Sequence, residues 1–358
     1  MKKIISTIIS VFILLSQFPC ALATENNSEF PYFQDFNNPS VVDSTWKFTG
    51  LHGYTDDGTG GKQLEFYPQK SGGYNGQYAF QKPVESGVLK ISYSMKAGDS
   101  ARHVMYVFSS DNKQYPVMSV IPQSTAVSGY TSDGYAECII SKEFVFNEWY
   151  DVVSYIDMNN HTARTYLSDR NGNTYASGER PLDFRTKVDL MNVSRVEFQG
   201  WYVAETSVQK SNCIDNLRIE YEPISITMKT DYPGNVFGTN EEEIIKVSMK
   251  NGSNSGVANK LLWEVFSEEE GIVDKGEQII NLEAGEGIDF DIDPEIEKYG
   301  LYTLTANIQD ENGYVIQSKK IDFAKILSSE EGEYNDYFHI AAHVFRYGSP
   351  LESAELMQ

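Results

Sequence analysis

The sequence predicts a mostly β protein, with two successive β-sandwiches followed by the beginning of a βα unit. Aromatic residues are abundant, with 23 Tyr and 19 Phe, and this composition favours strands over helices. Short runs with period-two alternation recur along the chain, separated by Gly, Asn, Asp and Ser. With 358 residues, the chain is long enough for two or more domains.

Residues 1–23 are typical of a secretory signal peptide. Lys2 and Lys3 precede an apolar run from Ile4 to Phe18, and Ala21-Leu22-Ala23 offers a small-x-small cleavage site. The run is too short for a retained membrane anchor. We therefore expect an exported protein, secreted or associated with the cell surface.

The chain is strongly acidic, which excludes two classes of partner. Its formal net charge is −22, and removal of Lys2 and Lys3 with the signal peptide would change this to −24. A chain of this charge without a basic cluster repels nucleic acid and anionic membranes. The acidity could serve solubility or, as the more specific alternative, cation binding. We expect a monomer.

Residues 24–222 predict the first β-sandwich. About 200 residues of short strands favour a two-sheet sandwich over a small barrel. The clearest runs are Leu89–Met95, Val104–Phe108, Trp149–Ile156, Ala163–Leu167 and Arg195–Phe198. Trp149 lies in the most regular of these runs, so we expect it in the core.

Three short motifs in this region resemble the concanavalin A-like lectin and glucanase superfamily. They are Asp35-Phe36 followed by Trp46, the run Asn147-Glu148-Trp149-Tyr150-Asp151-Val152 with the hairpin after it, and Cys213-Ile214-Asp215-Asn216-Leu217. The resemblance implies a jelly-roll fold and a carbohydrate-binding module.

Residues 223–325 predict a second sandwich of about 100 residues, the size of an immunoglobulin-like domain. Gly300–Leu304 followed by Asp310–Tyr314 resembles the final hairpin of the bacterial immunoglobulin-like modules that accompany catalytic domains. The resemblance implies a spacer.

Residues 326–358 predict an exposed linker and a βα unit. Tyr337–Val344 reads as a buried strand, and Ser349 with Pro350 and Glu352 has the spacing of a helix start. The unit resembles the first strand and helix of the (β/α)8 barrel of clan A glycoside hydrolases. The resemblance implies that the chain is the N-terminal part of a truncated enzyme. The catalytic glutamates of such barrels lie on later strands.

Sugar binding needs flat aromatic faces and planar polar groups, and several residues beside glycines could supply them. The alternative for each is ordinary packing or a half-exposed sheet position. Trp201 is the first choice, with Arg102 and His103 as polar partners. The full set of predicted carbohydrate-binding residues is Trp201, Tyr202, Tyr74, Tyr78, Tyr130, Arg102 and His103.

Calcium is the predicted cofactor. In jelly rolls of the resembled type the first and last strands are often neighbours, and Asp35 and Asp215 could together bind a structural ion; the alternative is two ordinary edge residues. No zinc-binding spacing is present. Cys138 and Cys213 could form a disulfide or remain two buried thiols.

Catalytic motifs are weak. A retaining glycosidase needs two carboxylates about 5 Å apart, and Glu197 lacks a second acid at short spacing. We therefore expect the first sandwich to bind rather than cleave, as the carbohydrate-binding region of a polysaccharide-degrading glycoside hydrolase. The alternative is an extracellular adhesion or structural protein without a catalytic domain.

Overall fold

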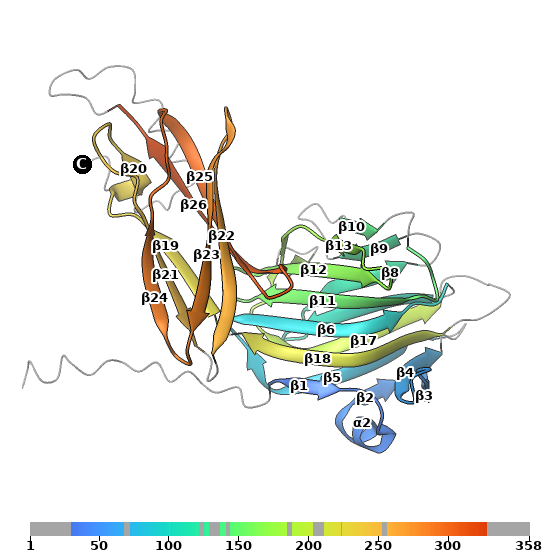
Figure 1. Ribbon diagram of the computed structural model, residues 1–358. Coiled ribbons are helices and arrows are strands. Elements are labelled where there is room, and N and C mark those ends of the chain that lie inside the picture. The colour runs from blue at the N-terminus through green and yellow to red at the C-terminus, as the bar shows by residue number, and fades with distance from the viewer. Residues whose placement is uncertain are drawn as a thin grey trace, which may run out of the picture.

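The computed structural model describes residues 30–67, 72–99, 101–121, 125–128, 137–140, 144–184, 188–202, 211–222, 224–252 and 256–327 (Figure 1). These residues are mostly β-strand, as predicted, and form several sheets. The expected signal peptide, Tyr130 and the expected βα unit lie outside the described residues. No helix among the residues described is long and apolar enough to cross a membrane.

One large sheet of the first sandwich has nine strands. Its order is β13-β12-β11-β6-β18-β4-β3, with β1 paired to β18 and β14 paired to β12. The strands are β1 (Tyr32–Gln34), β3 (Leu51–Asp56), β4 (Lys62–Tyr67), β6 (Val88–Lys96), β11 (Trp149–Asp157), β12 (Thr162–Asp169), β13 (Thr174–Ala176), β14 (Arg180–Pro181) and β18 (Asn212–Glu222).

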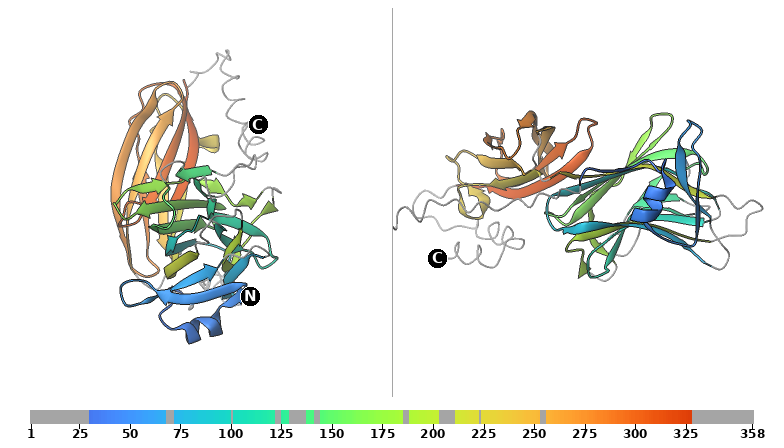
Figure 2. Two further views of the ribbon diagram at one scale, coloured as in Figure 1. Left: turned by 90° about the vertical axis from the view of Figure 1, so that its right-hand side faces the viewer. Right: turned by 90° about the horizontal axis from the view of Figure 1, so that it is seen from below.

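The facing sheet has seven strands in the order β10-β9-β8-β7-β17-β5-β2. They are β2 (Lys47–Thr49), β5 (Tyr74–Val84), β7 (Ala101–Phe108), β8 (Gln114–Ile121), β9 (Thr125–Ser128), β10 (Glu137–Ile140) and β17 (Val193–Tyr202). The two sheets of the first sandwich are seen packed face to face in Figure 2. A short helix, α2 (Pro39–Thr45), precedes β2, and β15 (Asp183–Phe184) pairs with β16 (Val188–Asp189).

The core of this sandwich lies between the two sheets, because every second side chain of each strand points inward. Val196 and Phe198 of β17 are fully buried there, as are Ile214 and Ile219 of β18. Trp46 stacks on Phe198 with ring centroids 6.2 Å apart. The opposite side chains of the same strands form the outer faces of the sandwich.

The second sandwich pairs a three-stranded sheet with a five-stranded one. The sheet orders are β19-β21-β24 and β20-β26-β25-β22-β23. The elements are β19 (Ile224–Lys229), the 3-10 turn η1 (Pro233–Asn235), β20 (Val236–Phe237), β21 (Ile245–Asn251), β22 (Val257–Ser267), β23 (Gly271–Leu282), β24 (Gly287–Ile292), β25 (Gly300–Gln309) and β26 (Val315–Lys325). Val247, Leu261 and Leu304 lie in its core.

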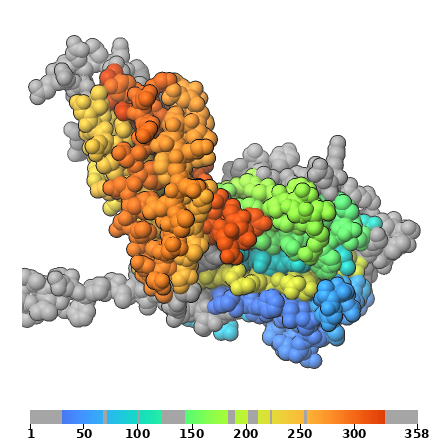
Figure 3. Space-filling view, viewed as in Figure 1, coloured from blue at the N-terminus to red at the C-terminus, as the bar shows by residue number. Residues whose placement is uncertain are grey.

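The turn between β25 and β26 packs on the outer face of the nine-stranded sheet (Figure 3). The Tyr314 ring stacks on Tyr166 with centroids 4.3 Å apart, and the Tyr166 hydroxyl accepts a 2.8 Å hydrogen bond from the Val315 amide. The second unit, expected as a spacer, therefore contacts the first sandwich directly.

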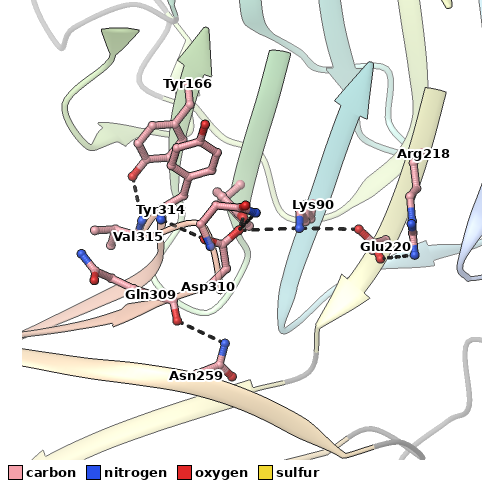
Figure 4. Close-up of polar contacts among 11 residues, drawn as sticks. Lys90, Tyr166, Arg218, Glu220, Asn259, Gln309, Asp310, Tyr314 and Val315 are labelled. Carbon is pink, nitrogen blue, oxygen red and sulfur yellow. Dashed lines mark hydrogen bonds and ion pairs between the residues drawn. The ribbon is translucent and has the colours of Figure 1, made fainter. Parts of the chain in front are cut away.

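Buried charge reinforces this junction (Figure 4). The hydroxyl of Tyr155, which is 1% exposed, donates a 2.5 Å hydrogen bond to Asp310 Oδ2. Lys90 Nζ lies 3.7 Å from carboxylate oxygens of both Asp310 and Glu220. A carboxylate with a cation and a hydroxyl donor around it has its charge compensated, so the contact is polar as well as aromatic.

Candidate functional site

The outer face of the seven-stranded sheet carries an unusual set of planar polar side chains. On β17, Arg195, Glu197, Gln199 and Trp201 alternate with the inward-facing residues. Pairing with β5 places Asn75 opposite Gln199 and Gln77 opposite Glu197, and pairing with β7 places Tyr106 opposite Glu197. We call this set on β5, β7, β8 and β17 the amide face; its members are Asn75, Gln77, Arg102, Val104, Tyr106, Phe108, Ser119, Arg195, Glu197, Gln199 and Trp201.

Glu197 is the centre of the amide face and is only 3% exposed. Its Oε1 accepts hydrogen bonds from Asn75 Nδ2 and, at 2.5 Å, from Gln199 Nε2. Its Oε2 lies 3.4 Å from Arg195 Nε, which forms a hydrogen-bonded ion pair with it. A buried carboxylate needs such partners to offset its lost hydration, so Glu197 holds the side chains around it in fixed orientations.

Arg195 links this centre to an aromatic ring and to a turn. Its guanidinium carbon lies 3.8 Å from the centroid of the Phe108 ring, and its Nη1 donates a 3.0 Å hydrogen bond to Asn112 Oδ1. Val104, Tyr106 and Phe108 form a small apolar cluster on this outward side of β7. The amide face therefore places an apolar surface beside hydrogen-bonding groups.

Trp201 and Arg102 form the exposed end of the amide face. They are paired across β17 and β7, and the guanidinium carbon of Arg102 lies 4.9 Å from the Trp201 ring centroid. Arg102 Nε also donates a 3.0 Å hydrogen bond to Ser119 Oγ. Trp201 remains 38% exposed, so a large flat ring stands at the surface with its orientation supported by a cation.

The ring of Tyr74 lies on the core side of Gly200, the residue before Trp201. Gly200 has no side chain on its core side, and a Cβ there would lie 2.2 Å from Tyr74 Cζ, so glycine is needed for the ring to fit. The Tyr74 hydroxyl accepts a 2.6 Å hydrogen bond from Asn212 Nδ2 and lies 2.9 Å from His103 Nδ1. Burial raises the pKa of Tyr74 and lowers that of His103 to about 4, so both are neutral near pH 7.

The structure brings two of the predicted sugar-binding residues together on this face, Trp201 and Arg102. It places Tyr74, Tyr78 and His103 in the core instead, because their positions on β5 and β7 alternate with the outward ones. They cannot contact a ligand on the amide face. The side chain of Tyr202 and all of Tyr130 lie outside the described residues.

Sequence reasoning missed the polar members of the site, Asn75, Gln77, Arg195 and Gln199, and assigned no binding role to Glu197. The available signal was the period-two relation along β17, which puts Arg195, Glu197 and Gln199 on the face of Trp201. The neighbouring strands became part of the site only through pairing, which links Asn75 to a residue 124 positions later.

Trp149 is a correction to the sequence prediction. It was expected in the core because it begins the most regular strand, but it lies partly exposed on the nine-stranded sheet. Lys96 Nζ lies 5.0 Å from its ring centroid. The phase of β11 places Tyr150 and Val152 inward, so Trp149 takes the opposite side.

Asp35 and Asp215 are brought near each other because β1 pairs with β18. Burial raises the pKa of Asp215 to about 6, and the charges of Asp57 and Asp35 add to the increase. The carboxylate oxygens of Asp35 accept hydrogen bonds from Asn37, and those of Asp215 accept them from Asn216. Local hydrogen bonds therefore already occupy the two predicted calcium ligands.

Within the described ranges, no group of three or more His, Cys, Asp or Glu side chains is arranged to hold a metal ion. The two predicted carboxylates do not by themselves fit a calcium site, which takes six to eight oxygen ligands. Cys213 is a buried free thiol, and burial raises its pKa to about 12. The side chain of Cys138 lies outside the described residues.

Comparison with known proteins assigns no family to this chain. No protein-family model matches it, and no curated protein matches it. Among solved structures, lectin II from Ulex europaeus aligns with 54% of this chain and 98% of its own at 9% identity, with a TM-score of 0.39. Peanut lectin aligns with 52% of this chain and 96% of its own at 11% identity, with a TM-score of 0.36.

A lectin from Bauhinia forficata, solved in complex with GalNAc, gives a TM-score of 0.34 at 10% identity over 53% of this chain and 97% of its own. TM-scores below 0.5 assign neither a family nor a ligand. The amide face is therefore interpreted from its own chemistry.

Proposed function

We propose that the first sandwich is a carbohydrate-binding module and that the amide face is its binding surface. The observation that carries this proposal is the position of Trp201, a partly exposed ring on the same face as the amides ordered by Glu197. An aromatic ring can stack on the apolar side of a pyranose while planar amides bind its hydroxyls.

Binding rather than hydrolysis follows from the acids on this face. Among the described strands β2, β5, β7, β8 and β17, Glu197 is the outward-facing carboxylate, and it is buried beneath its partners. Retaining hydrolysis requires two carboxyl groups about 5 Å apart. In this proposal Glu197 organises the site and attacks no bond.

The wider proposal concerns the whole chain. The first sandwich would be a concanavalin A-like jelly roll, the second an immunoglobulin-like module, and both would belong to an exported, polysaccharide-degrading glycoside hydrolase whose barrel begins at the end of this sequence. The direct packing of the two sandwiches supports a fixed arrangement of the binding surface relative to the second sandwich.

Affinity gel electrophoresis of the exported chain through gels containing different polysaccharides tests the binding. We expect retardation in at least one gel and a loss of at least tenfold in affinity for Trp201→Ala, since burying a large ring against a ligand contributes about 1.5–3 kcal/mol. Tyr67→Ala is the matched control, because Tyr67 is 37% exposed on the other sheet. Equal losses in both variants, or no retardation in any gel, would overturn the proposal.

A further inference from the structure

We propose that Glu197 is a specificity-determining residue that makes the amide face selective for neutral glycans over glycans bearing carboxylates. This inference rests on the proposed function and names its ligand class. Glu197 would not touch the sugar. It would act by fixing which atoms of its neighbours are presented to the sugar.

The orientation of two amides is the first step. The Asn75 and Gln199 side chains both direct an N–H toward Glu197 Oε1. An amide is planar with its oxygen on the other branch, so the oxygens of these two groups are turned away from the carboxylate. An amide oxygen is only an acceptor. The two groups therefore each present an acceptor oxygen, with the second N–H of the amide as a further donor. Sugar hydroxyls can both donate to the oxygen and accept from the N–H, whereas an ionised carboxylate has no proton to donate to the oxygen.

Charge is the second step. Glu197 already pairs with Arg195, whose guanidinium is further held by Asn112 and by the Phe108 ring. A uronate brought to this place would add a second anion beside a buried one, where screening by water is weak. The whole chain also carries a net charge of −22, which repels polyanions at long range.

Two cations favour the opposite class. Lys47, exposed on β2 opposite Gln77, is one of them. Arg102 is the other, because a guanidinium can bind a carboxylate with two parallel hydrogen bonds. Its flat side, however, lies against Trp201, and its Nε donates to Ser119. These contacts give Arg102 a supporting role for the ring. An acidic glycan held by Arg102 is therefore the competing outcome of the test.

The experiment compares matched polymers. Neutral glucan, mannan and galactan are each paired with the same polymer after oxidation of its primary hydroxyls to carboxylates, and affinities are measured by gel retardation at 0.15 M and 0.5 M NaCl. We expect at least one neutral polymer to bind and its oxidised form to bind at least tenfold more weakly. The preference should persist at 0.5 M NaCl, where the screening length is about 4 Å, because the repulsion by Glu197 is local.

Glu197→Gln tests the residue itself. A glutamine at this position loses the charge and places its NH2 against a donor on either branch, Arg195 at the Oε2 position or the two amides at the Oε1 position, so the network must rearrange. We expect neutral binding to weaken about tenfold and the preference for the neutral polymer to fall below threefold. Thermal unfolding of the variant checks that it folds. If it does not fold, the comparison of wild-type affinities at the two salt concentrations still distinguishes local repulsion from repulsion by the whole chain.

The outcomes separate the two claims. Tighter binding of oxidised polymers would overturn this inference and leave the proposed function standing, with Arg102 as the anion-binding group. A preference that disappears at 0.5 M NaCl would also overturn it, because the charge of the whole chain would then explain it. A preference that Glu197→Gln leaves unchanged would exclude Glu197 as its cause. No binding to any polymer would overturn the proposed function and the inference together.

Discussion

The two outer faces of the first sandwich each carry a tryptophan beside a cation, yet they differ in what lies next to it. Trp201 and Arg102 sit next to amides ordered around the buried Glu197. Trp149 and Lys96 sit on the nine-stranded sheet, whose far end is covered by the turn between β25 and β26. Exposed aromatics on a sheet can thus serve ligand contact or module packing, and the polar groups around them distinguish the two.

The largest expected effect on stability lies on the outer face of the nine-stranded sheet, where the turn between β25 and β26 covers it. Tyr155→Ala removes a buried ring and its hydrogen bond to Asp310, and we expect a loss of about 3–5 kcal/mol in the free energy of unfolding. Calorimetry should show the two sandwiches unfolding less cooperatively, while glycan affinity of the folded protein changes less than twofold. A large loss of affinity would mean that the two faces are not independent.

Tyr74→Phe tests the buried hydrogen bonds that lie beneath the amide face. The variant keeps the ring under Gly200 but removes the hydroxyl that Asn212 and His103 contact. Leaving buried polar groups without a partner costs about 1–3 kcal/mol, measurable by chemical denaturation. We expect a small change in glycan affinity, because the ring that packs against Gly200 remains. Unchanged stability would show that the buried network contributes little.

Asp215, on β18 of the nine-stranded sheet opposite Ser94, provides a pH-dependent test away from the amide face. Its pKa is about 6 in the folded protein against an ordinary value of 3.8, mainly through burial. The folded state therefore binds the proton more tightly than the unfolded state does. The contribution of Asp215 to stability falls as pH rises from about 4 to 6 and remains lowest above that.

Asp215→Asn removes this penalty, so we expect the variant to be more stable than the wild type at pH 7, by at most about 3 kcal/mol, with the difference vanishing near pH 4. Denaturation at both pH values, with and without calcium, measures it. Calcium-dependent stabilisation of the wild type that is absent from the variant would instead support the predicted metal site.

The smallest expected effect concerns the second tryptophan. Trp149→Ala should change glycan affinity less than twofold, in contrast to the loss of at least tenfold expected for Trp201→Ala. The reason is that Asp151, the carboxylate two residues along β11 on the same face, is half-exposed and is bonded by Ser94 and Arg170 rather than by amides. A comparable loss in both variants would mean that the ring alone, without ordered amides, suffices for binding.

Local pattern alone determined the strand content of this protein. Period-two alternation and glycine-rich turns predicted mostly β structure, and the run Arg195–Phe198 became part of β17 as expected. Trp201 could also be selected from the sequence as an aromatic residue beside a glycine, and Arg102 as a cation in a β-type run. Alternation along one strand is a local property, so the spacing of nearby residues is enough to reveal it.

Only the tertiary structure decided which face each residue joined and which strands lay side by side. Tyr74, Tyr78 and His103 belong to strands that were correctly expected to be β, but their phase places them in the core. Asn75 and Glu197 meet because β5 pairs with β17 over more than a hundred residues of intervening chain. Strand pairing depends on the whole fold burying its apolar faces at once, and no short stretch of sequence contains that information.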